Sequence, residues 1–477
     1  MQSSTDVHDV ERCRFVAEGL SDVGYRVPEP SVSRQGNSWR VSPRPLALSG
    51  EQVAWLYALG PKLHAFNVAS NELYLESVAG RQPPWIARYL DQGKPGDLIR
   101  HSLTRHVRSA CPTVIRPDVI PTPDGMLITE LDAVPGGMGV IARSAERYNA
   151  LGHALIGDDV TVPGAFAAMI RAQSRDGSTP RLAIVVSDES AAYRPEMAWL
   201  AERLCGFGID AHAVTPGDLS FCDDGVRLKG SRDDANVNVV YRFFELFDLP
   251  NIPSADKLML LNAATRVAVV PPLRPVFEEK MWFALFRHPL LTTYWRKALG
   301  ADTCAFLQAC IPPTWILDPE PIPPSATIPG LLAGGTAVNS WTHLENLGRS
   351  QRHFVIKPSG FSERAWGSRG VVVGHDISTP DWNAALRQAV LDFGHTPHVL
   401  QEFRSGRQFE GHFFDVASGS TRTIPCRVRL CPYYFVIGQQ VKLASVMATM
   451  CPLDKKKIHG MPDAIIVPCN VDGKAVQ

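Results

Sequence analysis

The sequence predicts an α+β fold with more than one domain, on the strength of three patterns. A short β-hairpin is expected at residues 113–131, between helical segments. A strand–helix–strand pattern follows at 181–215, which is typical of a parallel sheet. Beyond residue 354, short apolar strands alternate with polar loops and one helix. The 477 residues are enough for two or three domains with substantial cores.

Composition and charge exclude several classes of protein. The chain has 48 basic and 48 acidic residues, so we expect neither nucleic acid nor an anionic membrane as a partner. The N-terminus lacks the pattern of a signal peptide, and no apolar run is long enough to span a membrane. The ten cysteines form no CxxC pair, which indicates reduced core cysteines. A cytoplasmic location is therefore predicted.

The first 107 residues are expected to form a helical region. Residues 1–50 are polar and rich in Ser and Pro, and we expect them to wrap a surface or to be partly loose. Ser49 can cap a helix over about 51–63, and more helix is expected at 71–78 and 84–107. After the hairpin, residues 144–155 and 163–172 also have helical patterns.

The hairpin carries the most informative charges. Its strands, 113–120 and 126–131, are joined by a Pro-Asp-Gly turn. Residues i and i+2 of a strand face the same way, so Glu130 and Asp132 can point together with Asp118 beside them. Such a set suits Mg²⁺, and Arg116 would be a fixed positive charge next to it. The alternative is a solvated acidic hairpin.

The parallel-sheet pattern predicts a Rossmann-like unit. Strands are expected at 181–187 and 209–215, with a helix at 195–205 between them and a third strand at 238–241. The unit lacks a GxGxxG sequence, so no dinucleotide is assigned to it.

Two lysines and a glycine-containing loop suggest a phosphate site. Lys357 ends the apolar strand 354–357, and a loop that includes Ser359, Gly360 and Gly370 follows. Backbone amides of such a loop can hold phosphate oxygens, and a lysine adds positive charge. Lys280 lies at the start of an expected long helix, where the helix dipole does not stabilise a cation. The alternatives are an ordinary surface turn and an exposed lysine.

The strand 398–403, His-Val-Leu-Gln-Glu-Phe, ends in polar groups. The backbone at Glu402 and Phe403, with the Gln401 or Glu402 side chain, could meet an adenine edge and a ribose. Taken alone, the pattern is that of an edge strand with a solvated glutamate.

Together these pieces resemble the ATP-grasp superfamily. Lys280 at a helix start, IPPT at 311–314, VIKP with its loop and VLQEF follow one another in the order usual for that family. The resemblance implies that ATP is bound by Lys280, Lys357, the loop and 401–403. The family's metal strand should follow at the C-terminus, but the chain ends in DAIIVPCNVDGKAVQ. The hairpin near the N-terminus, R-x-D followed by E-x-D, looks like the missing piece.

The resemblance therefore implies a circularly permuted ATP-grasp fold, similar to glutathionylspermidine synthetase-like ligases. It implies Asp118, Glu130 and Asp132 as Mg²⁺ ligands, although Asp132 replaces the family's Asn. The expected domains are a helical region (1–107), the permuted metal-binding part (108–177), a Rossmann-like pre-ATP-grasp domain (178–260) and the nucleotide-binding domain (261–477). No glutathione or spermidine pocket can be matched.

The function that this resemblance implies is an ATP- and Mg²⁺-dependent ligase joining a small carboxylate to an amine through an acyl-phosphate. Arg116 and Lys357 are the expected catalytic residues, by charge stabilisation. Arg427 and Arg429, two residues apart on one strand, are candidates for holding the acceptor carboxylate, and the alternative is a surface pair. The alternatives are an ATP-binding protein without catalysis and a phosphotransferase using His459. The oligomeric state stays open.

One topological expectation follows from the permutation. The hairpin should pair with the sheet that carries Lys357 and Gln401. Glu130 and Asp132 should then lie within a phosphate's length of Lys357, on the order of 10 Å.

Overall fold

The structure, a computed structural model, describes residues 4–26, 38–174, 179–230, 235–323, 325–455, 457–459, 461 and 463–472. The expectation for residues 1–50 thus falls partly outside the described residues. Residues 4–20 are not loose, because they form a helix, α1, that buries Cys13, Val16 and Leu20. In the described part of the chain, no helix has both the length and the apolar character needed to cross a membrane.

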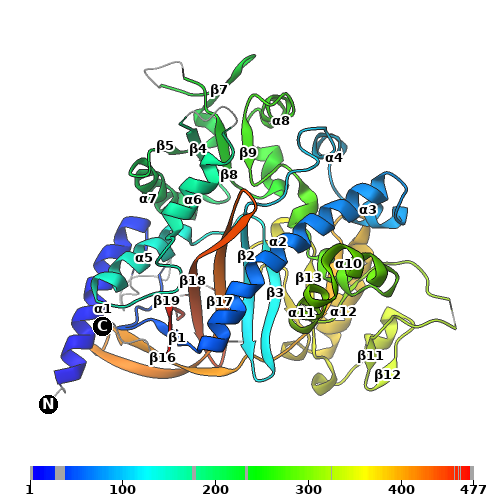
Figure 1. The fold of residues 1–477 in the computed structure, drawn as a ribbon. Helices are drawn as coiled ribbons and strands as arrows, with labels where there is room; N and C mark the ends of the chain where they lie inside the picture. The colour runs from blue at the N-terminus through cyan, green and yellow to red at the C-terminus, as the bar shows by residue number, and fades with distance from the viewer. Residues whose placement is uncertain are drawn as a thin grey trace.

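The largest sheet is antiparallel except at one edge and combines strands from both ends of the chain. Its order is β1-β19-β18-β17-β2-β3, with β16 paired to β17, and only β1 runs parallel to its neighbour β19. Figure 1 shows the cyan hairpin of β2 and β3 beside the red and orange strands near the C-terminus. These strands are β1 (Leu46–Leu48), β2 (Val114–Thr122), β3 (Gly125–Asp132), β16 (Gln408–Asp415), β17 (Ser420–Ile437), β18 (Gln440–Pro452) and β19 (Ile465–Val471).

The hairpin forms where the sequence predicts it. Gly125 has a φ of 136°, which side chains disfavour, and it begins β3 directly after the turn. In the register, Arg116 is opposite Asp132 and Asp118 is opposite Glu130, and a shift follows between Asp118 and Val119. The four charged residues therefore form two cross-strand pairs at the far end of the hairpin.

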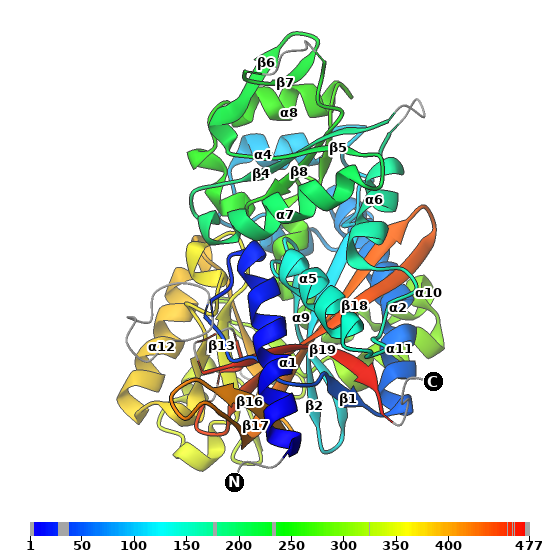
Figure 2. The same cartoon turned by 90° about the vertical axis from the view of Figure 1, so that its left-hand side faces the viewer.

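Long helices cover this sheet. Ser49 caps α2 with a capping box, as its position predicts, but α2 continues to Val78 as one helix despite Pro61. Helix α2 packs on β17 and β18, and Figure 2 shows α1 running over β16 and β17. The helices of the first 171 residues are α1 (Ser4–Leu20), α2 (Gly50–Val78), α3 (Pro84–Leu90), α4 (Gly96–Ser102), α5 (Met138–Ala150) and α6 (Val162–Arg171).

A separate parallel sheet has the order β5-β4-β8-β9 and forms the upper part of the molecule in Figures 1 and 2. Its fourth strand comes from beyond residue 260, the boundary expected for this unit, because Ala268–Val270 pairs with β8. The elements are β4 (Arg181–Val186), α7 (Arg194–Cys205), β5 (Asp210–Val214), β8 (Val239–Phe243), α8 (Ala255–Ala263) and β9 (Ala268–Val270), with a small ribbon of β6 (Leu219–Cys222) and β7 (Gly225–Leu228).

A third sheet, with the order β10-β15-β13-β14, carries Lys357 and Gln401. Its elements are β10 (Thr314–Ile316), β13 (Phe354–Pro358), β14 (Val372–Val373), α12 (Thr379–Leu391) and β15 (His398–Glu402). A short ribbon of β11 (Leu332–Ala333) and β12 (Thr336–Ala337) lies between β10 and β13 in the chain. Helices α9 (Met281–Arg287), α10 (Thr292–Leu299) and α11 (Ala301–Cys310) connect the third sheet to the parallel sheet.

Three expectations are corrected. The hairpin pairs with β17 of the large sheet, not with the sheet of Lys357, because its apolar face completes the large core. The helix expected to be long after residue 278 has only seven residues, Met281–Arg287. Residues 422–428 and 433–437, two of the short separate strands expected beyond residue 354, belong to one 18-residue strand, β17, which runs through Pro432.

Candidate functional site

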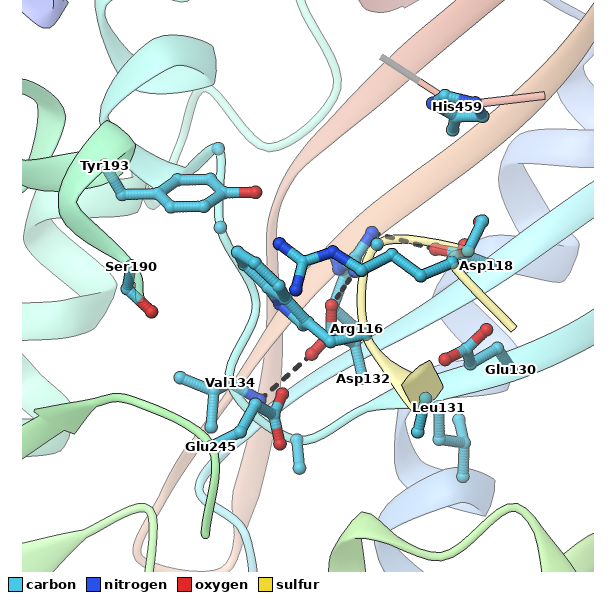
Figure 3. A pocket seen from close by; sticks show the side chains of 18 of the residues that line it. Arg116, Asp118, Glu130, Leu131, Asp132, Val134, Ser190, Tyr193, Glu245 and His459 are labelled. Carbon is cyan, nitrogen blue, oxygen red and sulfur yellow. Dashed lines mark hydrogen bonds and ion pairs between the residues drawn. The ribbon is translucent and has the colours of Figure 1, made fainter. Parts of the chain in front are cut away.

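One cavity of about 460 Å³ collects most of the charged residues singled out in the sequence. Figure 3 shows it from close by. Its walls come from the far end of the hairpin, from β17 and β18, from the loop after β13 and from the ends of β4 and β8. Lys280, from the residue before α9, therefore meets the acidic end of the hairpin in this cavity. Among the described residues, Lys357 is not part of the cavity wall.

Asp118 is held by two arginines. Arg116 Nη1 lies 2.8 Å from one carboxylate oxygen, and Arg429 Nη1 lies 2.9 Å from the other. Burial raises the pKa of this carboxyl, but the guanidinium groups of Arg429 and Arg116 outweigh it, and the net shift is downward. Cys431, which the sequence did not single out, accepts from Arg116 at 3.1 Å. The acidic hairpin is thus not a solvated one.

The other two carboxylates each contact a cation. Asp132 is paired with Arg116, its cross-strand neighbour, and also accepts from the Val134 amide at 3.0 Å. Glu130 Oε1 lies 2.9 Å from Lys280 Nζ. Arg116 therefore bridges Asp118 and Asp132, as a fixed positive charge between two of the expected metal ligands.

The carboxylates are not gathered around one point. Within the described residues, no group of three or more His, Cys, Asp or Glu side chains is placed to hold a metal ion. Both oxygens of Asp118 are occupied by guanidinium donors, whereas Glu130 faces the cavity with Lys280 as its cationic contact. The three-carboxylate Mg²⁺ site stays a prediction, and Glu130 fits it best.

Lys280 reaches the cavity from the residue before α9. Its Nζ contacts Glu130 and donates to the Ala365 carbonyl at 3.2 Å, while its backbone amide donates to the Ser359 carbonyl at 2.9 Å. Burial lowers the pKa of this ammonium group, but Glu130 outweighs burial and raises it overall. Lys280 is therefore a fixed charge in the cavity wall, not a mobile surface lysine.

The residues of the loop after β13 have different roles. Ser359 is fully buried, and its hydroxyl accepts from the Met281 amide at 2.9 Å and donates to Glu279. It secures the start of α9 and is not exposed to a ligand. Gly360 lines the cavity, and a Cβ there would lie 2.3 Å from the Glu278 carbonyl oxygen. Gly370 is packed against Pro358 and Arg364 and does not line the cavity.

Lys357 is buried between the third sheet and the hairpin. Its Nζ donates to the Thr129 carbonyl and to the Gln401 side-chain oxygen, each at 2.9 Å. Burial is the main reason that its pKa falls from 10.5 to about 8, and the nearby Lys280 adds to the effect while Glu130 opposes it. The lysine therefore stays mostly charged near neutral pH but loses its proton at a lower pH than an ordinary lysine does.

The expected adenine strand is not an edge strand. β15 lies between β10 and β13, the Glu402 amide donates to the Pro313 carbonyl, and the Phe403 amide donates to the His353 carbonyl, each at 2.9 Å. Among the described residues, the walls of the cavity do not include Gln401, Glu402 or Phe403. Their amides are therefore engaged within the sheet, and adenine contact stays a prediction.

The two arginines proposed to hold the acceptor carboxylate differ in their position relative to the cavity. Arg429 lines the cavity and binds Asp118. Arg427 donates to the Leu453 carbonyl at 2.8 Å and is not part of the cavity wall. Only Arg429 is placed to act on a ligand.

Three cavity residues were missed. Ser190 and Tyr193 follow β4, and Glu245 follows β8, its parallel neighbour. Figure 3 shows them across the cavity from Asp118 and Glu130. Burial and the nearby Glu278 and Asp132 raise the pKa of Glu245 well above its usual range. Ligands bind at the carboxyl ends of parallel strands, so the strand pattern itself could have pointed to these residues.

Comparisons with known proteins bear on the fold. No family model and no curated protein matches the chain. A glutathione synthetase-like effector from Globodera pallida, solved without ligand, matches with a TM-score of 0.56 and 11% identity, over 97% of this chain and 96% of that chain. This likeness shows the overall fold alone.

Two further solved structures match less well. A putative γ-glutamylcysteine synthetase from Methylobacillus flagellatus has a TM-score of 0.38 and 10% identity, over 88% of this chain and 87% of that chain. D-alanyl-alanine synthetase A from Vibrio cholerae has a TM-score of 0.24 and 11% identity, over 61% of this chain and 88% of that chain. The chain therefore shares the overall fold of the glutathione synthetase-like effector.

Proposed function

We propose that the protein is an ATP- and Mg²⁺-dependent ligase that joins a small carboxylate to an amine through an acyl-phosphate. One observation carries the proposal: Glu130 of the hairpin lies 2.9 Å from Lys280 in a cavity that Gly360 also lines. These residues come from three distant segments, and together they provide anionic and cationic groups for a phosphate ester. The ATP-grasp-like fold supports the same reading.

Two finer structural proposals accompany this function. The chain is proposed to be circularly permuted, because the hairpin completes the large sheet next to β17, a strand near the C-terminus. The parallel sheet, extended by β9, is proposed as the Rossmann-like pre-ATP-grasp domain, with its carboxyl ends facing the cavity.

The phosphate side of the site would use both lysines. Lys280 already points into the cavity and would neutralise phosphate charge. Lys357 would exchange the Thr129 carbonyl for a phosphate oxygen, and this anion would favour the charged ammonium form of the lysine further. The backbone at Gly360 can approach a phosphate closely because no side chain intervenes. Adenine would be held by 401–403 after these groups exchange partners.

The residues fit a magnesium ion in part. Oxygen donors are the right chemistry, and Glu130 and Asp132 line the cavity, whereas Asp118 could contribute only after Arg429 releases one of its oxygens. When bound, Mg²⁺ would neutralise charge on the transferred phosphate. The dominant role of Asp118 in the described arrangement is to orient the two arginines.

The chemistry itself needs no side-chain nucleophile. A carboxylate oxygen of the substrate would attack the γ-phosphorus, and ADP would leave. The neutral amine would then attack the acyl carbon, and the C–N bond would form as the C–O bond to phosphate breaks. The proton that the amine loses would pass to the leaving phosphate. Arg116, which is held between Asp118 and Asp132, would stabilise the negative charge of the tetrahedral intermediate.

Product analysis tests the function. The protein would be incubated with Mg²⁺, ATP and a pool of carboxylates and amines, and Glu130→Ala would serve as the matched control. ADP plus phosphate that depends on both substrate types supports the ligase. Binding of ATP without turnover would support a binding protein instead.

A second candidate is favoured by one observation. His459 lines the same cavity, so a phosphotransferase that passes the phosphate through a histidine also fits. ADP formed without free phosphate, and lost on His459→Ala, would indicate that reaction.

A further inference from the structure

A buried ion pair links the N-terminal helical region to the cavity wall. Lys94, in the turn between α3 and α4, pairs with Glu279, and both side chains are 0% exposed. Glu279 immediately precedes Lys280, the lysine that faces Glu130. Burying two charges is costly unless further hydrogen bonds satisfy them, so the surroundings of the pair are informative.

Those surroundings form a continuous chain of hydrogen bonds. The second carboxylate oxygen of Glu279 accepts from the Ser359 hydroxyl, and that hydroxyl accepts from the Met281 amide at 2.9 Å. The Ser359 carbonyl accepts from the Lys280 amide, also at 2.9 Å. Lys94 is thus connected through one glutamate and one serine to the backbone on both sides of the Lys280 side chain.

The same group of contacts also fixes Gly360, the glycine that lines the cavity. A Cβ on Gly360 would lie 2.3 Å from the Glu278 carbonyl and 3.1 Å from Glu279 Oε1. The segment 278–281 and the segment 359–360 therefore touch at backbone distance. A shift of either segment would move both Lys280 and the backbone of Gly360.

The turn that carries Lys94 is itself anchored. The Tyr74 hydroxyl donates to Asp91 at 2.8 Å, and the Gln92 amide group donates to the Gly394 carbonyl at 2.6 Å. A Cβ on Gly93 would lie 1.9 Å from the His395 carbonyl oxygen. The backbone around Lys94 is therefore held in place, so the Lys94 side chain can keep Glu279 in one position.

We infer that Lys94 is a positioning residue for the phosphate side of the cavity, holding Lys280 and Gly360 in place through Glu279 and Ser359. The inference rests on the proposed function, because it assumes that these groups meet a nucleotide phosphate. It adds that the N-terminal helical region, from which no residue is proposed as catalytic, sets the geometry of nucleotide binding.

The test separates positioning from mere stabilisation. Lys94→Met leaves Glu279 buried and unpaired, so this variant is expected to lose both stability and nucleotide affinity. The double variant Lys94→Met with Glu279→Gln removes both charges and should recover most of the stability, since neutral replacement of a buried pair is well tolerated. Lys257→Met, at an exposed position on α8, is the control.

Two measurements are made on each variant of the full chain. Urea unfolding gives stability, and calorimetry gives the affinity for Mg²⁺ with the β,γ-imido analogue of ATP. If Lys94 positions the site, the double variant should bind the analogue at least about tenfold more weakly than the wild type even with its stability recovered. Wild-type affinity in a stable double variant would overturn the inference.

A third variant keeps the test decisive if the double variant does not fold. Ser359→Ala leaves the Lys94–Glu279 pair intact and removes the link between it and α9. It should also weaken analogue binding, and unchanged affinity would count against the inference.

The result also distinguishes the inference from the proposed function. If the wild type itself fails to bind the analogue, both are wrong. If the wild type binds it and the double variant binds equally well, only the role of Lys94 is wrong.

Discussion

Lys357 Nζ lies 2.9 Å from the carbonyl oxygen of Thr129, 228 residues away in the sequence. The lysine belongs to the third sheet and the threonine to the hairpin of the large sheet, so this hydrogen bond joins two sheets that share no strand pair. Under the proposed function, a phosphate oxygen would replace this carbonyl as a partner of Lys357, and nucleotide binding would then loosen the contact between the two sheets.

Alanine at position 357 should chiefly weaken nucleotide binding, whereas alanine at position 130 should chiefly reduce turnover. Lys357→Ala should weaken binding of the Mg²⁺–ATP analogue about 10- to 100-fold, the usual value of a hydrogen bond to a charged group. Glu130→Ala should chiefly remove turnover, because the metal carboxylate matters most as charge develops. Calorimetry and ADP release measure the two quantities. Equal and small effects would place the site elsewhere.

Nucleotide binding should take up a proton at alkaline pH. The free Lys357 has a pKa of about 8, so at about pH 9 its amine is largely neutral, and contact with phosphate would protonate it. At about pH 6.5 the amine is already charged, and uptake should be close to zero. Calorimetry in buffers of different ionisation enthalpy measures the proton number. Lys357→Met should abolish the uptake, and a pH-independent proton number in the wild type would contradict the assignment.

Gly360→Ala should damage the cavity wall. The new Cβ would lie 2.3 Å from the Glu278 carbonyl oxygen, so the backbone must shift. We expect a loss of about 1–3 kcal/mol of unfolding free energy, typical of overpacking, and weaker analogue binding. Gly50→Ala is the matched control, because no atom lies within 4 Å of its Cβ position. Equal behaviour of the two variants would show that the close approach is not needed.

Glu196 should make stability depend on pH. Its buried carboxyl accepts from the Gly137 and Val140 amides, yet burial raises its pKa from 4.5 to about 7. The folded state therefore favours the protonated form more than the unfolded state does. The associated stability is present below about pH 4.5 and is lost as the pH rises through about 7, a change of about 3 kcal/mol.

Thermal unfolding between about pH 5 and pH 8 tests this dependence. Glu196→Gln should flatten the profile, whereas Glu202→Gln, at an exposed position on the same helix, should not. A wild-type melting temperature that rises across this range would contradict the prediction.

The local elements could be read from the sequence. The hairpin, its Pro-Asp-Gly turn, the cap at Ser49 and the strands at 181 and 354 all form near their expected positions. Each depends on periodicity or turn chemistry within a few residues, and such preferences act wherever the segment lies in the fold. The strand around Pro432 and the short α9 were misjudged, because a proline or a charged helix start is a weak local signal that tertiary pairing overrides.

For the candidate site, too, some features could be predicted from the sequence and others only from the structure. The sequence by itself identified the charged residues Arg116, Asp118, Glu130, Lys280 and Lys357, since residue type and strand spacing mark them. Only the tertiary structure decided their partners: Arg429 on Asp118, Thr129 on Lys357, and the Lys94–Glu279 pair beneath Lys280. These contacts join segments more than 180 residues apart, and they arise because burying apolar surface brings three sheets together and every charge caught between them must find a partner.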